Sequence, residues 1–151
     1  DLRILGQQTG HEAEAATQAA FAANELTRLR QLYQGRKPVS LFYQLWTPPL
    51  TTVARGSWIQ EAIELCGGNN GFATSPTPYP QVTEEAVVVQ APSLIISAQD
   101  QHSLDFWQRW QQIPAVKHKQ LKISQPDRLQ RLTLRTLDGI AELCQLIDQA
   151  R

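Results

Sequence analysis

The residues best suited to chemistry lie close together in the middle of the 151-residue chain. They are Cys66, a tyrosine between two prolines (Tyr79), and two neighbouring carboxylates, Glu84 and Glu85. Proline on both sides favours extended backbone at Tyr79, so we expect its ring to be presented rather than buried in a regular element. The threonine before the glutamates can cap a short helix whose first turn favours negative charge. The stretch therefore combines a cysteine, a fixed aromatic ring and an acidic helix start.

The elements that must position these residues are predicted by hydrophobic periodicity and by the positions of glycine and proline. An alanine-rich segment whose apolar stripe includes Leu26, Leu29 and Leu32 predicts one long helix at residues 11–34. The later elements expected are strands at residues 38–45, 93–97 and 119–123, and helices at residues 58–65, just after residue 83, 101–112 and 126–149. Alternating strands and helices are typical of an α/β fold with parallel strands.

The loop that follows the first strand is a second candidate for contact with a ligand. In open α/β sheets, ligands bind outside the carboxyl ends of the strands. Trp46 and Leu50 lie in this loop, so both are candidates to face a ligand. The alternative for Trp46 is that it covers the edge of the core.

Composition and motifs exclude several classes of function. The formal net charge is zero, which gives no reason to expect nucleic acid as a partner. No apolar run of about 18 residues is present to span a membrane. The three histidines, His11, His102 and His118, are scattered and form no metal-ligand spacing with cysteine or carboxylate. The chain has no nucleophile elbow, phosphate-binding loop or dinucleotide fingerprint.

Two features near the centre of the chain leave alternatives open. The run from Gly67 to Gly71 could cradle an anion, but a helix end followed by a turn explains it without a ligand. Cys66 and Cys144 are the only cysteines, and from the sequence alone two buried free thiols are about as expected as a disulfide.

The motifs at residues 65–70 (LCGGNN) and 78–85 (PYPQVTEE) carry a resemblance to a known family. They resemble the C-terminal lobe of periplasmic vitamin B12-binding proteins, which are substrate-binding components of cobalamin ABC importers. The wider group also carries haem and iron–siderophores. The resemblance covers the chain from Val39 to its C-terminus, and the long helix before it more loosely.

This resemblance implies an architecture. Residues 38–151 would form a Rossmann-like α/β lobe with a central, mostly parallel sheet flanked by helices. Residues 1–37 would hold the end of an N-terminal lobe and the long interlobe helix. Cys66 and Cys144 match cysteines that form a disulfide in the family, which implies an oxidising compartment, the periplasm.

The resemblance also implies roles for individual residues. Tyr79 and Asp127 match ligand-binding positions, the alternatives being a packed loop residue and a helix cap. The family's aromatic after the Pro48–Pro49 pair is replaced here by Leu50, so Trp46 is the candidate to supply that aromatic face. Glu85 matches a glutamate that meets arginines on the membrane permease.

The function predicted is capture of cobalamin and its delivery to an ABC importer permease, with no catalysis, resident cofactor or metal. A tyrosine such as Tyr79 can also ligate haem iron, so haem or an iron–siderophore is the first alternative ligand. The second alternative is a free-standing α/β enzyme or nucleotide-binding domain.

Overall fold

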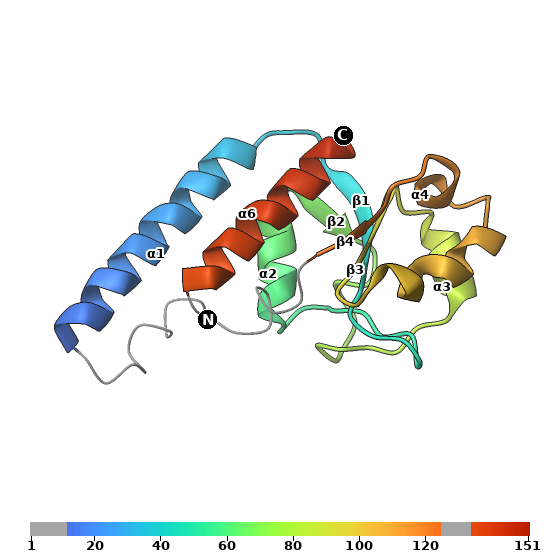
Figure 1. Cartoon of the computed structure of the whole chain (residues 1–151), viewed down its shortest axis with the longest axis horizontal. Helices are drawn as coiled ribbons and strands as arrows, with labels where there is room; N and C mark the ends of the chain where they lie inside the picture. The colour runs from blue at the N-terminus through green and yellow to red at the C-terminus, as the bar shows by residue number, and fades with distance from the viewer. Residues whose placement is uncertain (1–11, 125–133) are drawn as a thin grey trace.

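The computed structural model describes residues 12–124 and 134–151 of the chain (Figure 1). Its helices and strands alternate as the sequence predicts. In chain order the elements are α1 (Glu12–Tyr33), β1 (Val39–Gln44), α2 (Trp58–Leu65), β2 (Gly68–Asn70), α3 (Glu84–Gln90), β3 (Leu94–Ser97), the 3₁₀ helix η2 (Gln101–Arg109), α4 (Pro114–Lys117), β4 (Leu121–Ile123) and α6 (Leu134–Gln149).

The four strands form one sheet in the order β2-β1-β3-β4, and every pair is parallel. The chain leaves β1 for β2 on one side and then crosses to β3 on the other. The strand order therefore reverses between β1 and β3. The predicted α/β fold with a largely parallel sheet is confirmed.

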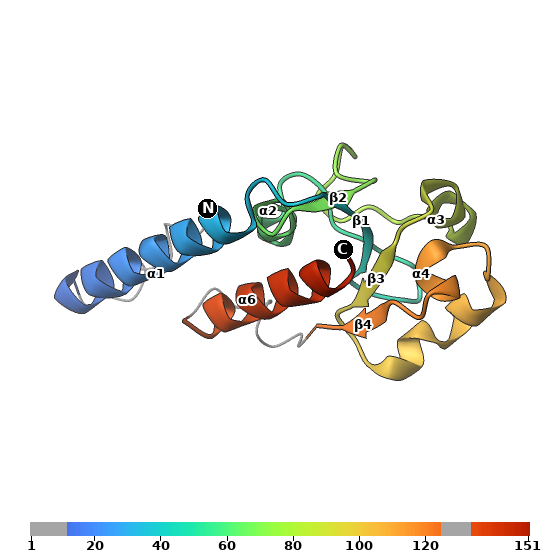
Figure 2. The same ribbon diagram turned by 90° about the horizontal axis from the view of Figure 1, so that it is seen from above.

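Helices cover both faces of the sheet, as Figures 1 and 2 show. On one face α1, α2 and α6 pack on Leu41, Tyr43 and Ile96. On the other face α3, η2 and α4 pack on Phe42 and Ile95. Alternate residues of each strand therefore enter different cores, as the two-residue repeat of a strand requires.

Local signals in the sequence set the helix ends. The Ser57 side chain accepts a hydrogen bond from the Ile59 amide at the start of α2, and the Thr83 side chain accepts one from the Ala86 amide at the start of α3. Gly67, just past α2, has a φ of 82°, which glycine adopts without steric cost. The predicted cap at Thr83 and the predicted helix end at Gly67 are confirmed.

The prediction for residues after Gly67 is partly wrong, because residues 68–70 form strand β2 instead of a turn. These residues lack the branched and aromatic side chains that favour strands. Their pairing with β1 comes from packing, since a Cβ at Gly68 would lie 2.6 Å from Leu41 Cδ2 and 2.7 Å from Ile63 Cγ2. Glycine is needed here because the strand passes so close to β1 and α2.

The predicted helix at residues 101–112 is shorter and tighter than expected. It is a 3₁₀ helix that ends at Arg109, and Trp110 lies beyond its last turn. The predicted strand at 119–123 begins only at Leu121, because Lys119 has a φ of 58° that breaks extended backbone.

The apolar stripe of α1 also differs from the prediction at one position. Leu29 and Tyr33 are buried and Leu26 packs against them, whereas Leu32 is 46% exposed. Positions 26, 29 and 33 repeat at helical spacing, and position 32 lies on another side of the helix. The stripe is therefore completed by the tyrosine and not by the last leucine.

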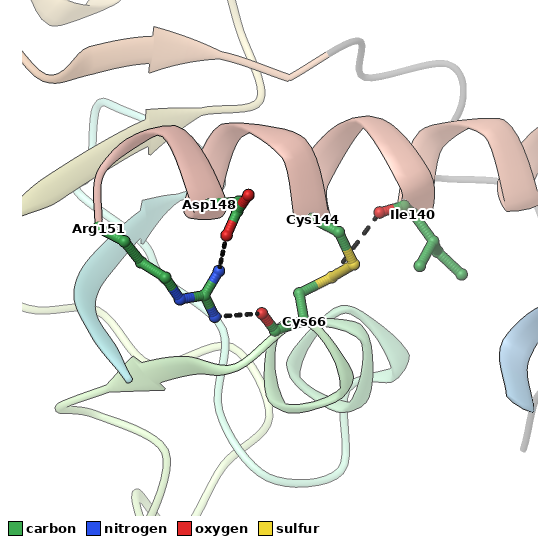
Figure 3. Close-up of a disulfide and its surroundings, with 5 residues drawn as sticks. All are labelled: Cys66, Ile140, Cys144, Asp148 and Arg151. Carbon is green, nitrogen blue, oxygen red and sulfur yellow. Dashed lines mark hydrogen bonds and ion pairs between the residues drawn. A yellow bond between two sulfur atoms is a disulfide. The ribbon is translucent and has the colours of Figure 1, made fainter. Parts of the chain in front are cut away.

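Cys66 and Cys144 form the predicted disulfide, which joins the end of α2 to α6 (Figure 3). Beside it, Arg151 donates to the carbonyl oxygens of Cys66 and Lys37 and to the Asp148 carboxylate. Arg36, just after α1, pairs with the same carboxylate at 2.8 Å. Hydrogen bonds from Arg36 and Arg151 hold the pKa of Asp148 below its ordinary value.

We predict that the disulfide contributes a large part of the stability. The loop-entropy relation for a separation of 78 residues gives an upper figure of about 4.5 kcal/mol. Reductant should therefore lower the urea midpoint of the wild type markedly and leave that of a Cys66→Ser/Cys144→Ser variant unchanged. A thiol assay on unfolded, non-reduced wild type should detect no free thiol, and two titratable thiols would contradict the pairing.

Candidate functional site

The carboxyl ends of the four parallel strands lie at one edge of the sheet, and the loops that follow β1 and β3 leave from neighbouring strands. In doubly wound sheets, ligands bind outside this edge at the point where the strand order reverses. Here that point is between β1 and β3. The edge is therefore the candidate ligand-binding site, and we call it the carboxyl edge.

Backbone pairing brings the Trp46 loop and the Tyr79 loop together at the carboxyl edge. Trp46 pairs with Thr51 in an antiparallel bridge, and Thr51 pairs with Gln81. The amides of residues 52 and 54 donate to the carbonyl oxygens of Pro80 and Pro78 at 3.0 and 2.8 Å. Tyr79 stands between these two bonds. The two aromatic residues, 33 positions apart in the sequence, therefore belong to one small paired structure.

Both aromatic side chains are exposed: Trp46 by 54% and Tyr79 by 50%. The Trp46 indole donates to the Pro48 carbonyl oxygen at 3.1 Å, so its orientation is fixed by its own loop. Neither ring belongs to the buried cores. Trp46 therefore does not serve to cover the core, and a ligand contact for both residues remains our prediction.

The other two predicted ligand residues have different outcomes. Leu50 is partly buried and packs against the core formed by α3, η2 and α4. Its carbonyl oxygen accepts from the Val82 amide at 3.0 Å, which helps to hold the two loops together, and a ligand contact by its side chain stays a prediction. Asp127 lies outside the described residues.

A buried polar network, which sequence reasoning missed, ties the ends of β1 and β3 to η2. In the Gln44 side chain, Nε2 donates to the Ser103 carbonyl oxygen at 2.9 Å, and Oε1 accepts from the Trp107 indole at 2.7 Å. The hydroxyls of Ser97 and Ser103 are 2.7 Å apart. Gln44 and Ser97 are fully buried, so these hydrogen bonds offset a desolvation cost of about 1–3 kcal/mol per unpaired group.

The network continues into the candidate site through Gln99. Its backbone amide donates to Ser97 Oγ at 3.0 Å, and its side-chain Oε1 accepts from the Thr47 amide at 3.0 Å. The Trp46 loop and the loop after β3 are thus joined directly. The sequence offered one indication of Gln99 as a site residue, because it comes soon after a buried strand, as Trp46 does. No motif includes this glutamine, so it was missed.

The side chain of Asn70, in the glycine-rich run, has partners within the protein and needs no anion to explain it. Its Nδ2 donates to the Val53 carbonyl oxygen at 2.7 Å and to Gln60 Oε1 at 2.9 Å. Its Oδ1 accepts from the Phe72 amide at 3.0 Å. The side chain therefore links α2, β2 and the loop between β1 and α2.

Glu84 and Glu85 lie next to each other in the first turn of α3 but have different surroundings. The Glu84 carboxylate accepts hydrogen bonds from the Arg109 guanidinium and, at 2.7 Å, from the Trp110 indole. Partial burial alone would raise the pKa of Glu84, but these bonds and the Arg109 charge lower it below its ordinary value. Glu85 is exposed. The two carboxylates are therefore not interchangeable, and Glu85 is the more accessible one.

Other titratable groups of the described chain do not assemble a reactive site. Burial raises the pKa of Tyr43, which therefore stays neutral in the core. Within residues 12–124 and 134–151, no group of three or more His, Cys, Asp or Glu residues could hold a metal ion. No helix in those ranges has the length and apolarity needed to cross a membrane.

A parallel α/β sheet whose strand order reverses at its centre is the architecture of many domains that bind ligands at the carboxyl edge. The chain belongs to the periplasmic binding protein family, whose model matches residues 1–127.

Two curated proteins are similar to this chain over nearly its whole length. The chain is 35% identical over 151 residues to the vitamin B12-binding protein of Vibrio cholerae, covering 97% of this chain and 51% of the relative. It is 32% identical over 153 residues to the vitamin B12-binding protein of Vibrio parahaemolyticus, covering all of this chain and 56% of the relative. The chain thus spans about half the length of these curated relatives. They are named as binding proteins, which supports a binding role for the family.

Solved structures agree with this assignment. The crystal structure of the periplasmic vitamin B12-binding protein of Vibrio cholerae superimposes with a TM-score of 0.84 at 34% identity, covering 99% of this chain and 59% of that one. The periplasmic haem-binding protein of Vibrio cholerae gives a TM-score of 0.78 at 18% identity, covering 93% of this chain and 59% of that one. At that identity the haem binder shows the shared fold alone.

The surroundings of Glu84 predict a pH dependence of stability. A carboxylate whose pKa is lowered by folding stabilises the fold above its unfolded value, near 4.5, and this stabilisation is lost as the pH falls through the folded pKa. Glu84→Gln should therefore destabilise the protein at pH 7, and its difference from the wild type should shrink below about pH 4.5.

Urea unfolding at pH 7, 5, 4 and 3 measures this difference. Glu61→Gln is the matched control, because Glu61 is exposed in the first turn of α2. It should change the free energy of unfolding less at neutral pH. A Glu84→Gln difference that stays constant from pH 7 to 3 would argue against the ion pair.

Proposed function

We propose that this chain is the C-terminal lobe of a periplasmic substrate-binding protein that captures cobalamin and delivers it to the permease of an ABC importer. The observation that carries the proposal is the pair of exposed aromatic residues, Trp46 and Tyr79, on two loops whose backbones pair at the carboxyl edge. A corrin is large, flat and mostly apolar, with polar groups around its rim. Aromatic faces with a few hydrogen-bonding groups suit such a ligand.

The choice of cobalamin is supported by the relatives. Identity to vitamin B12-binding proteins is 32–35%, against 18% for the haem binder. The division of the chain follows the same proposal: residues 1–37 hold the end of an N-terminal lobe and the interlobe helix, and residues 38–151 form the C-terminal lobe. The full-length protein would hold its ligand between two lobes, without catalysis or a resident cofactor.

The proposed location is the periplasm. The disulfide between Cys66 and Cys144 supports it, because disulfides form and persist in oxidising compartments.

The visible absorption spectrum of full-length protein after incubation with cyanocobalamin, or separately with haemin, tests the ligand. We expect a corrin spectrum retained after gel filtration and a dissociation constant in the micromolar range or tighter by calorimetry. The isolated 151-residue chain should bind weakly or not at all, because it supplies contacts from one side only. Retention of haem alone would favour the haem alternative, and micromolar binding by the isolated chain would contradict the two-lobe arrangement.

A second prediction concerns delivery. We propose that Glu85 meets arginines of the permease, since arginine pairs with carboxylates through two parallel hydrogen bonds. Glu85→Arg in the full-length protein should leave cobalamin affinity and the free energy of unfolding nearly unchanged. It should reduce, roughly tenfold, the ATP hydrolysis by the importer that the binding protein stimulates, because charge reversal at an interface slows encounter and weakens docking.

Glu61→Arg is a better control for this experiment than Glu84→Arg, because Glu61 is an exposed glutamate in the first turn of another helix. Glu84→Arg should also affect docking much less than Glu85→Arg, but it would place a second guanidinium beside Arg109 and disturb α3. Equal, small effects of Glu85→Arg and Glu61→Arg would leave Glu85 with a helix-dipole role only.

A further inference from the structure

Gln99 occupies a special position in the fold. It lies just after β3, with Ala98 between, at the carboxyl edge where the strand order reverses between β1 and β3. Its side chain is half-buried and contacts the backbone of Thr47, the residue next to Trp46. It therefore links its own loop, after β3, to the loop after β1, and these are the two loops that leave the switch point of the sheet.

The orientation of the Gln99 carboxamide is determined by its partner. The backbone N–H of Thr47 can only donate, so the carboxamide must turn its oxygen towards it. The observed distance from Thr47 N to Gln99 Oε1 is 3.0 Å. The main chain of Gln99 is also held, because its amide donates to the buried Ser97 Oγ at 3.0 Å.

With the oxygen engaged, the Nε2 group is left as a donor. Among the described residues nothing accepts a hydrogen bond from Gln99 Nε2, whereas its oxygen and its main-chain amide both have partners. The Gln99 side chain that carries this donor is hydrogen-bonded to the loop that holds the exposed Trp46 ring. Fixed donors beside aromatic faces are typical of sites that orient a large ligand.

We propose that Gln99 is a ligand-binding residue, whose Nε2 donates a hydrogen bond to a carbonyl or carboxylate oxygen on the rim of the ligand while its Oε1 stays bound to Thr47. This inference rests on the proposed function, because it places the ligand at the carboxyl edge. Trp46 then contacts the flat face of the ligand, and Gln99 recognises one polar group at its edge. The Thr47 bond prepares the carboxamide for this contact before the ligand arrives, which lowers the ordering cost of binding.

The experiment uses full-length protein and cyanocobalamin, with haemin as a second probe. Gln99→Leu removes both hydrogen bonds of the side chain at similar volume, and we expect the dissociation constant to rise about 3–10-fold. Gln101→Leu is the matched control, because Gln101 is exposed and only two residues away. It should change the dissociation constant less than twofold.

A second measurement separates direct contact from positioning of the Trp46 loop. The side-chain amide protons of ¹⁵N-glutamine-labelled wild type are compared with and without ligand, the Gln99 signals being assigned by their absence in Gln99→Leu. Direct contact predicts a shift of these signals and slower exchange with water, while those of Gln101 exchange as before. The opposite result is that Gln99→Leu weakens binding while the ligand leaves the exchange of the Gln99 side-chain protons in the wild type unchanged. Gln99 would then act only through Thr47, and the proposal would be overturned.

The remaining outcomes distinguish the inference from the proposed function. If Trp46→Ala weakens cyanocobalamin binding and Gln99→Leu does not, the inference fails and the proposed function stands. If wild type retains neither cyanocobalamin nor haemin, both fail.

Discussion

The pairing of β1 with β3 is the constraint on which the candidate site depends. The register sets Gln44 beside Ser97 at the last paired position of the two strands. Both residues are fully buried and polar, and such groups are tolerated only when they are hydrogen-bonded. Trp107 and the Ser103 carbonyl oxygen satisfy Gln44, and the Ser103 hydroxyl pairs with that of Ser97, so η2 must pack over the strand ends. The same network reaches the Trp46 loop through Gln99, so a buried feature of the core holds the loops of the candidate site in place.

The opposite, amino-terminal end of β1 is fixed by different means. The disulfide joins the end of α2 to α6, and Arg151 donates to the Cys66 carbonyl oxygen beside it (Figure 3). Arg151 also donates to the carbonyl oxygen of Lys37, just before β1. Arg36 stacks over the Tyr33 ring at 4.9 Å and pairs with Asp148, which connects the end of α1 to α6. The long helix is thus attached to the lobe at one end of the sheet, while the carboxyl edge stays free of these cross-links.

Features with local causes could be predicted from the sequence, and features caused by tertiary contact could not. Ser57, Thr83 and Gly67 mark helix ends because a side-chain acceptor or a positive φ is needed at that residue. Strand β2 was missed because its pairing depends on the space that Gly68 leaves beside Leu41, which no propensity encodes. Gln44 and Gln99 were missed for a similar reason: glutamine is common on surfaces, and their roles appear only when β1, β3 and η2 are assembled.

Glu84 and Glu85 illustrate the same limit within one helical turn. Both satisfy the preference for acidic residues near a helix start, so the helix dipole alone gives them equal weight. Arg109 and Trp110, about 25 residues further along the chain, engage one carboxylate and leave its neighbour exposed. The difference between a structural and an accessible carboxylate is therefore made by η2, and it explains how one of two identical side chains can be available to a partner.

The exposed aromatic rings also set a limit on what this lobe can do alone. A buried aromatic side chain removes about 150–250 Å² from water, so the remaining exposed half of Trp46 and of Tyr79 amounts to roughly 100 Å² each. At about 25 cal/mol per Å², covering both rings together with an equal area of the ligand yields roughly 10 kcal/mol. Micromolar affinity requires about 8 kcal/mol net, and association itself costs about 4–15 kcal/mol. Hydrogen bonds at the rim add about 1 kcal/mol each, so the two rings and a few such bonds fall short over most of this range. A second surface on the other side of the ligand is needed to close this gap, which is the physical reason for the two-lobe arrangement that we propose.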